Sequence, residues 1–358
     1  MAIKELVSSI VERAWGSPFL SLSLFCTFVC LSTRLLTGLQ YARVPGKQGL
    51  TRAGVLPYWL PYIGHFPNFA LDFEGILQKG RDSTKDGMFS LVMAGKKHQF
   101  VTIPSMVKTF FTKGNAIISS DEFLYWIHEK YFDDNGSTRR IPKDVFLNNI
   151  HRALGSLIRE PDLSNITDKT RKGCEDRTQD LVSLPFGKNE GTVWTAAARS
   201  SAIGSNNIEA NLWPLIMNFV GDIVASALMG QAFVENYPQL LEDLWIFDVA
   251  FSKLLSGMPG VTSGIRNAKA ARRRLKSNIR EWTEAIIATQ DGKDAGFKWS
   301  ELSDVSETMK IRTRKYYESG APADAYLAGN LAIFWGLMVN SNKVIFWMLL
   351  NIVANEDL

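Results

Sequence analysis

Residues 326–355, YLAGNLAIFWGLMVNSNKVIFWMLLNIVAN, form the stretch that decides the fold class. From Ala325 to Asn355 the only charged side chain is Lys343. A helix this long and apolar on all sides is either the central helix of a large domain or a membrane span. The polar cluster at residues 340–343 lies near its midpoint, where a bilayer would make those groups most costly. The pattern therefore favours a buried central helix over a second membrane span.

Upstream of this helix the sequence is mostly of helical type, with one hairpin near its start. The runs MFSLVMAG and HQFVTI are strand-like, and Gly95, Lys96 and Lys97 at their junction favour a tight turn. No repeat with a period of about 20–50 residues is visible, which excludes a solenoid. We therefore expect a mainly α fold with a small N-terminal β hairpin. Apolar periodicity predicts helices at residues 105–112, 121–130, 143–159, 168–183, 211–229, 237–256, 266–290, 301–319 and 323–355.

A second apolar stretch lies close to the N-terminus. Residues 14–33 carry no charge, and their apolar part, FLSLSLFCTFVCL, occupies residues 19–31. A helix of about 20 residues matches the thickness of a bilayer core. A cleavable signal peptide is the alternative, but the charged lead-in is long and no small-x-small cleavage site precedes Tyr41. We therefore expect an uncleaved transmembrane anchor.

Basic residues are more numerous after this anchor than before it. Lys4 and Arg13 precede it. Because basic flanks stay on the cytoplasmic side of a membrane, we expect the body of the protein to face the cytoplasm. The basic residues that follow the anchor are Arg34, Arg43, Lys47 and Arg52.

The next segment, residues 41–70, has the composition of a stiff hinge. Its prolines exclude a continuous helix, and its apolar character differs from that of a flexible Gly- and Ser-rich linker. Its aromatic residues suit a membrane interface, so we expect the hinge to contact both lipid and protein. The prolines are Pro45, Pro57, Pro61 and Pro67, and the aromatic residues are Tyr58, Trp59 and Tyr62.

Composition and charge exclude several classes of protein. The net charge is +4, from 40 basic and 36 acidic side chains, so we expect no nucleic-acid partner. With 46% hydrophobic and 21% charged residues, the chain has the composition of a globular protein and not of a disordered one. The 3 cysteines form no zinc pair, and the 4 histidines are too scattered for a two-His metal site.

The order of these features, an anchor, a proline hinge, an early hairpin and a long apolar helix, resembles that of a microsomal cytochrome P-450. The long helix resembles the oxygen-side helix of the branch that includes cholesterol 7-alpha-hydroxylase and prostacyclin synthase. In that branch a Trp precedes a lone Asn and a Phe-Trp pair follows; here these are Trp335, Asn340 and Phe346-Trp347. Upstream, NLWPLIMNFVGDIVASALMG, LEDLWIFDVAFSKLLSGMPG and IRNAKAARRRLKSNIREW are similar to the helices before and within the family's substrate roof.

The resemblance implies a heme-thiolate monooxygenase of the endoplasmic reticulum membrane. Such an enzyme oxidises a lipophilic substrate, such as a terpenoid, a sterol or another secondary metabolite, with O2 and electrons from an NADPH-dependent reductase. The resemblance places Asn340, as the catalytic residue, and Gly336 on the heme side of the long helix. It places His151 and Arg152 at the heme propionates. A satisfied core amide is the alternative for Asn340, and a surface cation is the alternative for the His151-Arg152 pair.

The family's Glu-x-x-Arg helix and cysteine loop follow the long helix, whereas the given sequence ends at Leu358. We therefore expect an anchor at 1–40, a hinge at 41–70 and a partial P-450-like domain at 71–358. The proximal cysteine, whose thiolate ligates the iron, is expected to be absent, and with it activity. The cysteines present are Cys26 and Cys30 in the anchor, and Cys174 on a helix that we expect to be solvated.

Two further interpretations concern surfaces. A non-catalytic, membrane-anchored helical binding or interaction protein that retains an apolar pocket is the alternative to the enzyme. The basic run Arg272-Arg273-Arg274, with Lys269, Lys276 and Arg280 nearby, is predicted to be a solvated helix face, or else a contact with anionic lipid headgroups.

Overall fold

The computed structural model describes residues 17–42, 53–84, 87–112, 119–182, 192–204, 207–255 and 263–355. The chain divides into two compact units, Met1–Ser119 and Ser120–Leu358. The predicted boundaries near residues 40 and 70 both lie within the first unit and stay predictions.

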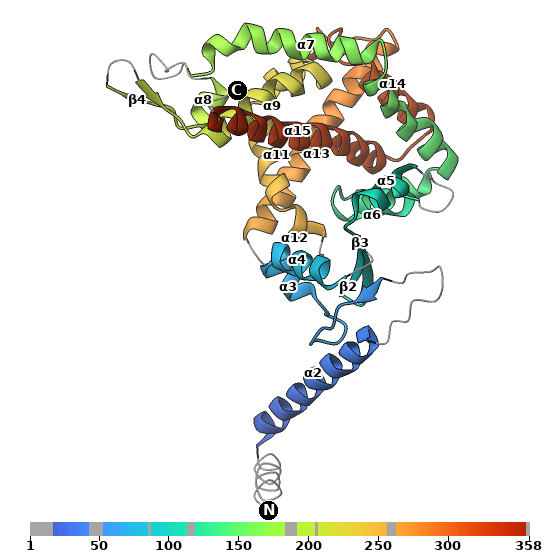
Figure 1. Ribbon diagram of the computed structural model, residues 1–358. Helices are drawn as coiled ribbons and strands as arrows, with labels where there is room; N and C mark the ends of the chain where they lie inside the picture. The colour runs from blue at the N-terminus through green and yellow to red at the C-terminus, as the bar shows by residue number, and fades with distance from the viewer. Residues whose placement is uncertain are drawn as a thin grey trace, which may run out of the picture. The chain divides into compact units, whose positions relative to one another are not determined.

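The first unit combines the apolar N-terminal helix with a small sheet (Figure 1). The strands lie in the order β1-β2-β3, with β1 parallel to β2 and β2 antiparallel to β3. The predicted hairpin is confirmed: its turn is Ala94-Gly95, and both residues have positive φ, which glycine adopts without strain. The elements are α2 Pro18–Ala42, β1 Gly54–Val55, α3 Phe66–Leu71, α4 Phe73–Ser83, β2 Met88–Met93, β3 Lys96–Val101 and α5 Pro104–Thr112.

Residues 58 and 59 of the expected hinge contact the end of α2. The Thr37 hydroxyl accepts a hydrogen bond from the backbone N–H of Tyr58 at 3.2 Å. The guanidinium of Arg34 lies 5.6 Å from the ring centre of Trp59, a cation–π contact. Helix α3 was not expected there, yet it begins where Pro67 occupies the first turn, the position at which proline is tolerated.

The second unit is a helical domain with one short hairpin, β4 Ser201–Ile203 and β5 Asn207–Glu209, which the sequence analysis missed. Its α-helices are α6 Asp121–Lys130, α7 Asp162–Arg177, α8 Val193–Ala197, α9 Leu212–Met229, α10 Gln231–Asn236, α11 Leu240–Val249, α12 Phe251–Leu255, α13 Ser263–Gln290, α14 Glu307–Glu318 and α15 Ala323–Ala354. Other helical turns are η1 Thr138–Arg140, η2 Val145–His151, η3 Arg152–Ile158, η4 Thr178–Asp180 and η5 Phe297–Trp299. The expected mainly α fold with a small sheet is confirmed.

The core of this unit lies where α13 meets α11 and α15. Trp282 of α13 is fully buried at its centre, and its indole N–H donates to the Met229 carbonyl at the end of α9 at 2.8 Å. Burial of large aromatic side chains of this kind contributes much of the free energy of folding.

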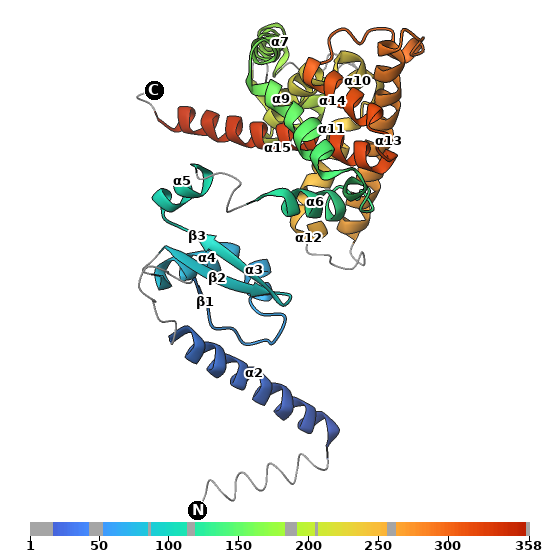
Figure 2. The ribbon, with the colours of Figure 1, turned by 90° about the vertical axis from the view of Figure 1, so that its right-hand side faces the viewer.

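Helix α15 is buried along its first half and exposed along much of its second half (Figure 2). In the second half Phe346 and Leu349 pack against the cluster around α9, whereas Val344, Trp347 and Met348 face solvent. The prediction of a buried central helix is therefore correct for the first half only. By length and composition, three described helices are apolar enough to cross a membrane: α2, which has no buried residues in its apolar window, α9, which is mostly buried, and α15.

Residues 143–159 were expected to form one α-helix, but they form a π-helical segment, η2, followed by a 3₁₀ segment, η3. Arg312 of α14 donates to the Ile150 carbonyl at 2.9 Å, and Lys315 donates to the Asn149 carbonyl at 3.3 Å. Because side chains from another helix bind carbonyls here, the regular α-helical hydrogen-bond ladder is interrupted.

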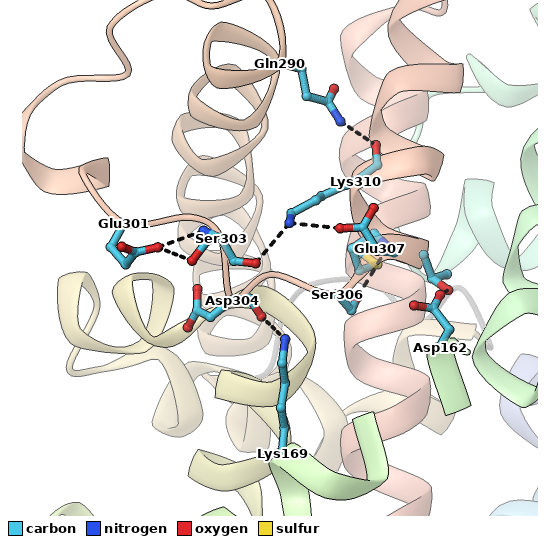
Figure 3. Close-up of polar contacts among 11 residues, drawn as sticks. Asp162, Lys169, Gln290, Glu301, Ser303, Asp304, Ser306, Glu307 and Lys310 are labelled. Carbon is cyan, nitrogen blue, oxygen red and sulfur yellow. Dashed lines mark hydrogen bonds and ion pairs between the residues drawn. The ribbon is translucent and has the colours of Figure 1, made fainter. Parts of the chain in front are cut away.

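The loop before α14 is held by a polar network (Figure 3). Lys310 donates to the Ser303 carbonyl and pairs with Glu307, both at 3.0 Å, and Lys169 donates to the Asp304 carbonyl at 2.5 Å. The side chain of Ser306 caps α14 by accepting from the Met309 N–H. The helix therefore begins at Glu307 and not at residue 301 as predicted.

Candidate functional site on α15

Gly336 and Asn340 lie one turn apart on α15. The side chain of Asn340 is exposed, and its amide donates to the Gly336 carbonyl at 2.9 Å. A Cβ built on Gly336 would meet no atom within 4 Å, so the surface beside this glycine is open. The pair therefore forms an open patch with one polar side chain, which we call the Gly336–Asn340 face.

The buried amide of the polar cluster is that of Asn342, not that of Asn340. Asn342 is fully buried, and its side chain donates to the Met217 carbonyl of α9 at 3.1 Å. The sequence analysis missed it, although helical spacing places residue 342 on the same stripe as Leu331, Phe334 and Met338.

Aromatic rings from α12, α11 and the turn after α6 gather around Trp335, the residue before Gly336. Trp335 stacks on Phe251 of α12, with ring centres 5.3 Å apart and planes at 12°, and meets Tyr131 edge-on at 5.2 Å. Tyr131 in turn stacks on Phe247 of α11 at 4.2 Å. Burial raises the pKa of Tyr131, so its phenol stays protonated and donates to the Phe247 carbonyl. We call these rings, together with Phe132, the aromatic cluster.

A single carboxylate joins α11 to α15 at this place. Asp248 accepts the indole N–H of Trp335 and pairs with the ammonium of Lys343, each at 3.0 Å. The sequence analysis missed Asp248. The sequence could have indicated its role, because Asp248 is the lone acid in the apolar run LWIFDVAF. An acid in a buried helix needs a polar partner.

His151 and Arg152 lie at the junction of η2 and η3. His151 is half-buried with its ring near Phe146, whereas Arg152 is exposed. Burial and the nearby Arg312 lower the pKa of His151, which favours its neutral form. Within the described ranges, no hydrogen bond, ion pair or ring contact joins this pair to the Gly336–Asn340 face, so the structure does not bring the four residues together.

Arg312 occupies the space between η2 and α15. Its side chain is fully buried and donates to the carbonyls of Ile150 at 2.9 Å and Gly329 at 3.4 Å, and to the Tyr316 hydroxyl at 3.0 Å. Nothing in the basic stretch KIRTRK predicted that one of its cations is buried.

Beside Arg312 lies a second buried polar residue, His128 of α6. It shares a hydrogen bond with the Thr138 hydroxyl at 3.2 Å. Burial, aided by the positive charge of Arg312, lowers the pKa of His128 to about 3.

We expect this histidine to make folding sensitive to acid. In the unfolded chain it binds a proton near pH 6.5, whereas in the folded chain it does so only near pH 3, so stability is lost as pH falls between those values. From pH 7 to pH 4.5 the free energy of unfolding should fall by about 2.5 kcal/mol more in the native chain than in His128→Gln. Urea unfolding at both pH values measures this difference, and equal pH slopes in the two proteins would contradict it.

The basic run of α13 is solvated only in part: Lys269, Arg273 and Arg280 are exposed, as predicted, whereas Arg272 is not. Arg272 is buried, donates to the Tyr131 carbonyl at 2.7 Å and pairs with Asp133 at 2.6 Å. Arg274 binds both carboxylate oxygens of Asp243. Arg272 and Arg274 are thus bound by carboxylates of the fold, and a contact of the exposed cations with lipid headgroups stays a prediction.

The described cysteines do not suit the axial ligand of a heme iron. Cys174 of α7 is half-buried against the cluster around α9, whereas the sequence analysis expected it to be solvated. Burial raises the pKa of its thiol. Cys26 and Cys30 belong to α2. The Gly336–Asn340 face, by contrast, suits one side of a flat ring, since it is open and carries a single short polar side chain. The described residues thus offer a surface for one side of a heme, but no suitable cysteine ligand for its iron.

Comparison with known proteins gives one informative relative. The chain is 22% identical over 371 residues to cytochrome P-450 monooxygenase efuG of Hormonema carpetanum. The alignment covers 98% of this chain and 61% of the relative, so the chain spans less than two thirds of that protein. No protein-family model matches. The similarity supports the resemblance to the cytochromes P-450 that the residues of α15 and the substrate-roof segments first indicated.

Proposed function

We propose that this chain forms the oxygen-side part of a heme-thiolate monooxygenase that oxidises a lipophilic substrate such as a terpenoid, a sterol or another secondary metabolite. The observation that carries the proposal is the similarity to a cytochrome P-450 monooxygenase along 98% of the chain. The open Gly336–Asn340 face beside the aromatic cluster supports it.

In this proposal the Gly336–Asn340 face lies against the heme, which when bound activates O2 with electrons from an NADPH-dependent reductase. Gly336 lets a flat ring approach the helix backbone, because it has no side chain. The amide of Asn340 is fixed by the Gly336 carbonyl and so presents its remaining polar atoms in one orientation. For the propionates Arg152 is a better partner than His151, because it is exposed and always charged.

Trp335 and Phe251, the two partly exposed rings of the aromatic cluster, would supply apolar surroundings for a lipophilic substrate. Trp335 and Phe251 present stacked rings at the edge of the Gly336–Asn340 face, and the phenol of Tyr131 is already bonded to a backbone carbonyl. Such a surface binds by excluding water and offers few hydrogen bonds. These residues would therefore orient a substrate by shape.

Heme spectroscopy tests the proposal. We expect the 358-residue chain, reduced and treated with carbon monoxide, to lack the long-wavelength Soret band of thiolate-ligated heme, because its described cysteines do not suit the iron. A chain extended with a family-like segment that contains the cysteine loop should gain that band. The Cys174→Ser form of the extended chain is the control and should keep it. Failure of every extended chain to bind heme would refute the proposed function.

For the location of the protein we propose a single-pass anchor at α2 in the endoplasmic reticulum membrane, with the body in the cytoplasm. The sequons at Asn135 and Asn165 provide the test, because both side chains are exposed and available for glycosylation if the body were lumenal. We expect both to stay unmodified in cells. A glycosidase-sensitive mass shift, abolished by Asn135→Gln and Asn165→Gln together, would reverse the orientation.

One observation favours the non-catalytic alternative, a membrane-anchored binding protein. Val344, Trp347 and Met348 form an exposed apolar surface on α15, and surfaces of this kind commonly bind another protein. The heme experiment discriminates between the two functions, because a binding protein would gain no thiolate band in any form.

A further inference from the structure

Two aspartates of helix α11 face different neighbours. Asp243, near its start, binds Arg274 of α13 through both carboxylate oxygens. Asp248, near its end, binds Trp335 and Lys343 of α15. Both side chains are largely buried, with exposed fractions of 4% and 12%. One end of α11 is thus joined to α13 and the other to α15.

The bond to Trp335 constrains the orientation of an aromatic ring. The neighbouring rings of Tyr131, Phe132 and Phe251 contact the indole through its faces and edges, and the Tyr131 hydroxyl makes a further polar contact with Trp335. Contacts between rings permit more than one orientation of the indole, whereas it has only one N–H donor. The carboxylate of Asp248, 3.0 Å from that nitrogen, selects the orientation in which the donor points toward α11.

Lys343 holds the carboxylate in place from the other side. Its ammonium lies 3.0 Å from the second oxygen of Asp248, two turns along α15 from Trp335. Hydrogen bonds to an ionised acceptor are roughly twice as strong as neutral ones. Asp248 therefore binds two points on α15 at once, which fixes the position of the α11–α12 junction next to them.

We infer that Asp248 is a positioning residue that holds the indole of Trp335 against Phe251 and so shapes the wall beside the Gly336–Asn340 face. The statement that a lipophilic substrate meets this wall rests on the proposed function. The orientation of Trp335 by Asp248 does not, because it follows from contacts within the helical unit.

Fluorine NMR of the full chain, labelled with 5-fluorotryptophan in detergent micelles, tests the inference. The Trp335 resonance is assigned by its loss in Trp335→Phe. We expect Asp248→Ala to shift or broaden that resonance, and Asp248→Asn to leave it near its native position, because the asparagine carbonyl still accepts the indole N–H. Asp243→Ala is the matched control: it removes an acid from the same helix but should leave the Trp335 resonance unchanged.

A second measurement compares two indoles of the native chain, each assigned by its loss in the corresponding Trp→Phe variant. Exchange of the Trp335 indole N–H with D2O should be about tenfold slower, or more, than that of Trp347, which is 61% exposed. Equal exchange of the two indoles, or a Trp335 resonance that ignores Asp248→Ala, would overturn the inference. Neither readout involves heme, so a negative result here is distinct from failure of the proposed function, which the carbon monoxide spectrum reports.

Discussion

Replacing Arg312 by alanine is expected to lower the free energy of unfolding by about 3–5 kcal/mol. The substitution leaves the buried carbonyls of Ile150 and Gly329 without this donor, and it removes a cation that lies 5.0 Å from the ring centre of Tyr316. It also opens a cavity in a fully buried place. Together these losses exceed the gain from no longer burying a charge.

Urea unfolding of the two forms measures the effect, and variants of the same helix control it. Arg312→Met restores most of the volume but none of the hydrogen bonds, so it should recover only the cavity part of the loss. Arg314→Ala, two residues away, removes a partly exposed cation paired with Asp291 and Glu318, and should cost much less, because solvent screens such surface pairs. If Arg312→Ala is no more costly than Arg314→Ala, the network around Arg312 does not support the fold.

The paired change Trp347→Gln and Met348→Gln is expected to move most of the protein from aggregates to monomers. Both native side chains are more than half exposed on α15 beside Val344. Large apolar surfaces exposed on a folded protein favour self-association, and glutamine keeps helix propensity while removing the apolar area. Size-exclusion chromatography with light scattering in a mild detergent measures the monomer fraction.

A control on the same helix separates this effect from a general loss of hydrophobicity. Met338→Gln changes a fully buried side chain and should reduce the monomer fraction by destabilising the core. An unchanged aggregate fraction in the Trp347 and Met348 variant would show that a different surface causes the self-association.

Apolar periodicity in the sequence predicted the helices well where the buried side chains recur at regular helical spacing. Helix α6 coincides with the prediction, and α9 and α13 differ from it only at their first turns. Prediction failed where long-range contacts override the local pattern. The π-helical segment η2 depends on donors from α14, and the break at Ala250 between α11 and α12 lies in a continuous apolar run.

The candidate site shows the same division. The sequence singled out Trp335, Gly336 and Asn340 of α15, and their place in a functional site stays a prediction. It could not reveal that Asn342 carries the buried amide, or that Asp248 binds Trp335, since both facts depend on which helix packs beside α15. Pairings between distant helices leave no periodic trace in a single sequence.

The π-helical segment η2, Val145–His151, also bears on comparison with relatives. A π turn accommodates about one more residue than an α turn, whereas the 3₁₀ turns of η3, which follow directly, accommodate fewer. The side chains of this segment are therefore out of step with those of a continuous α-helix over the same residues. A relative whose helix is purely α-helical here would place the residues aligned with His151 and Arg152 beside different neighbours, because one position turns a helical side chain by about 100°.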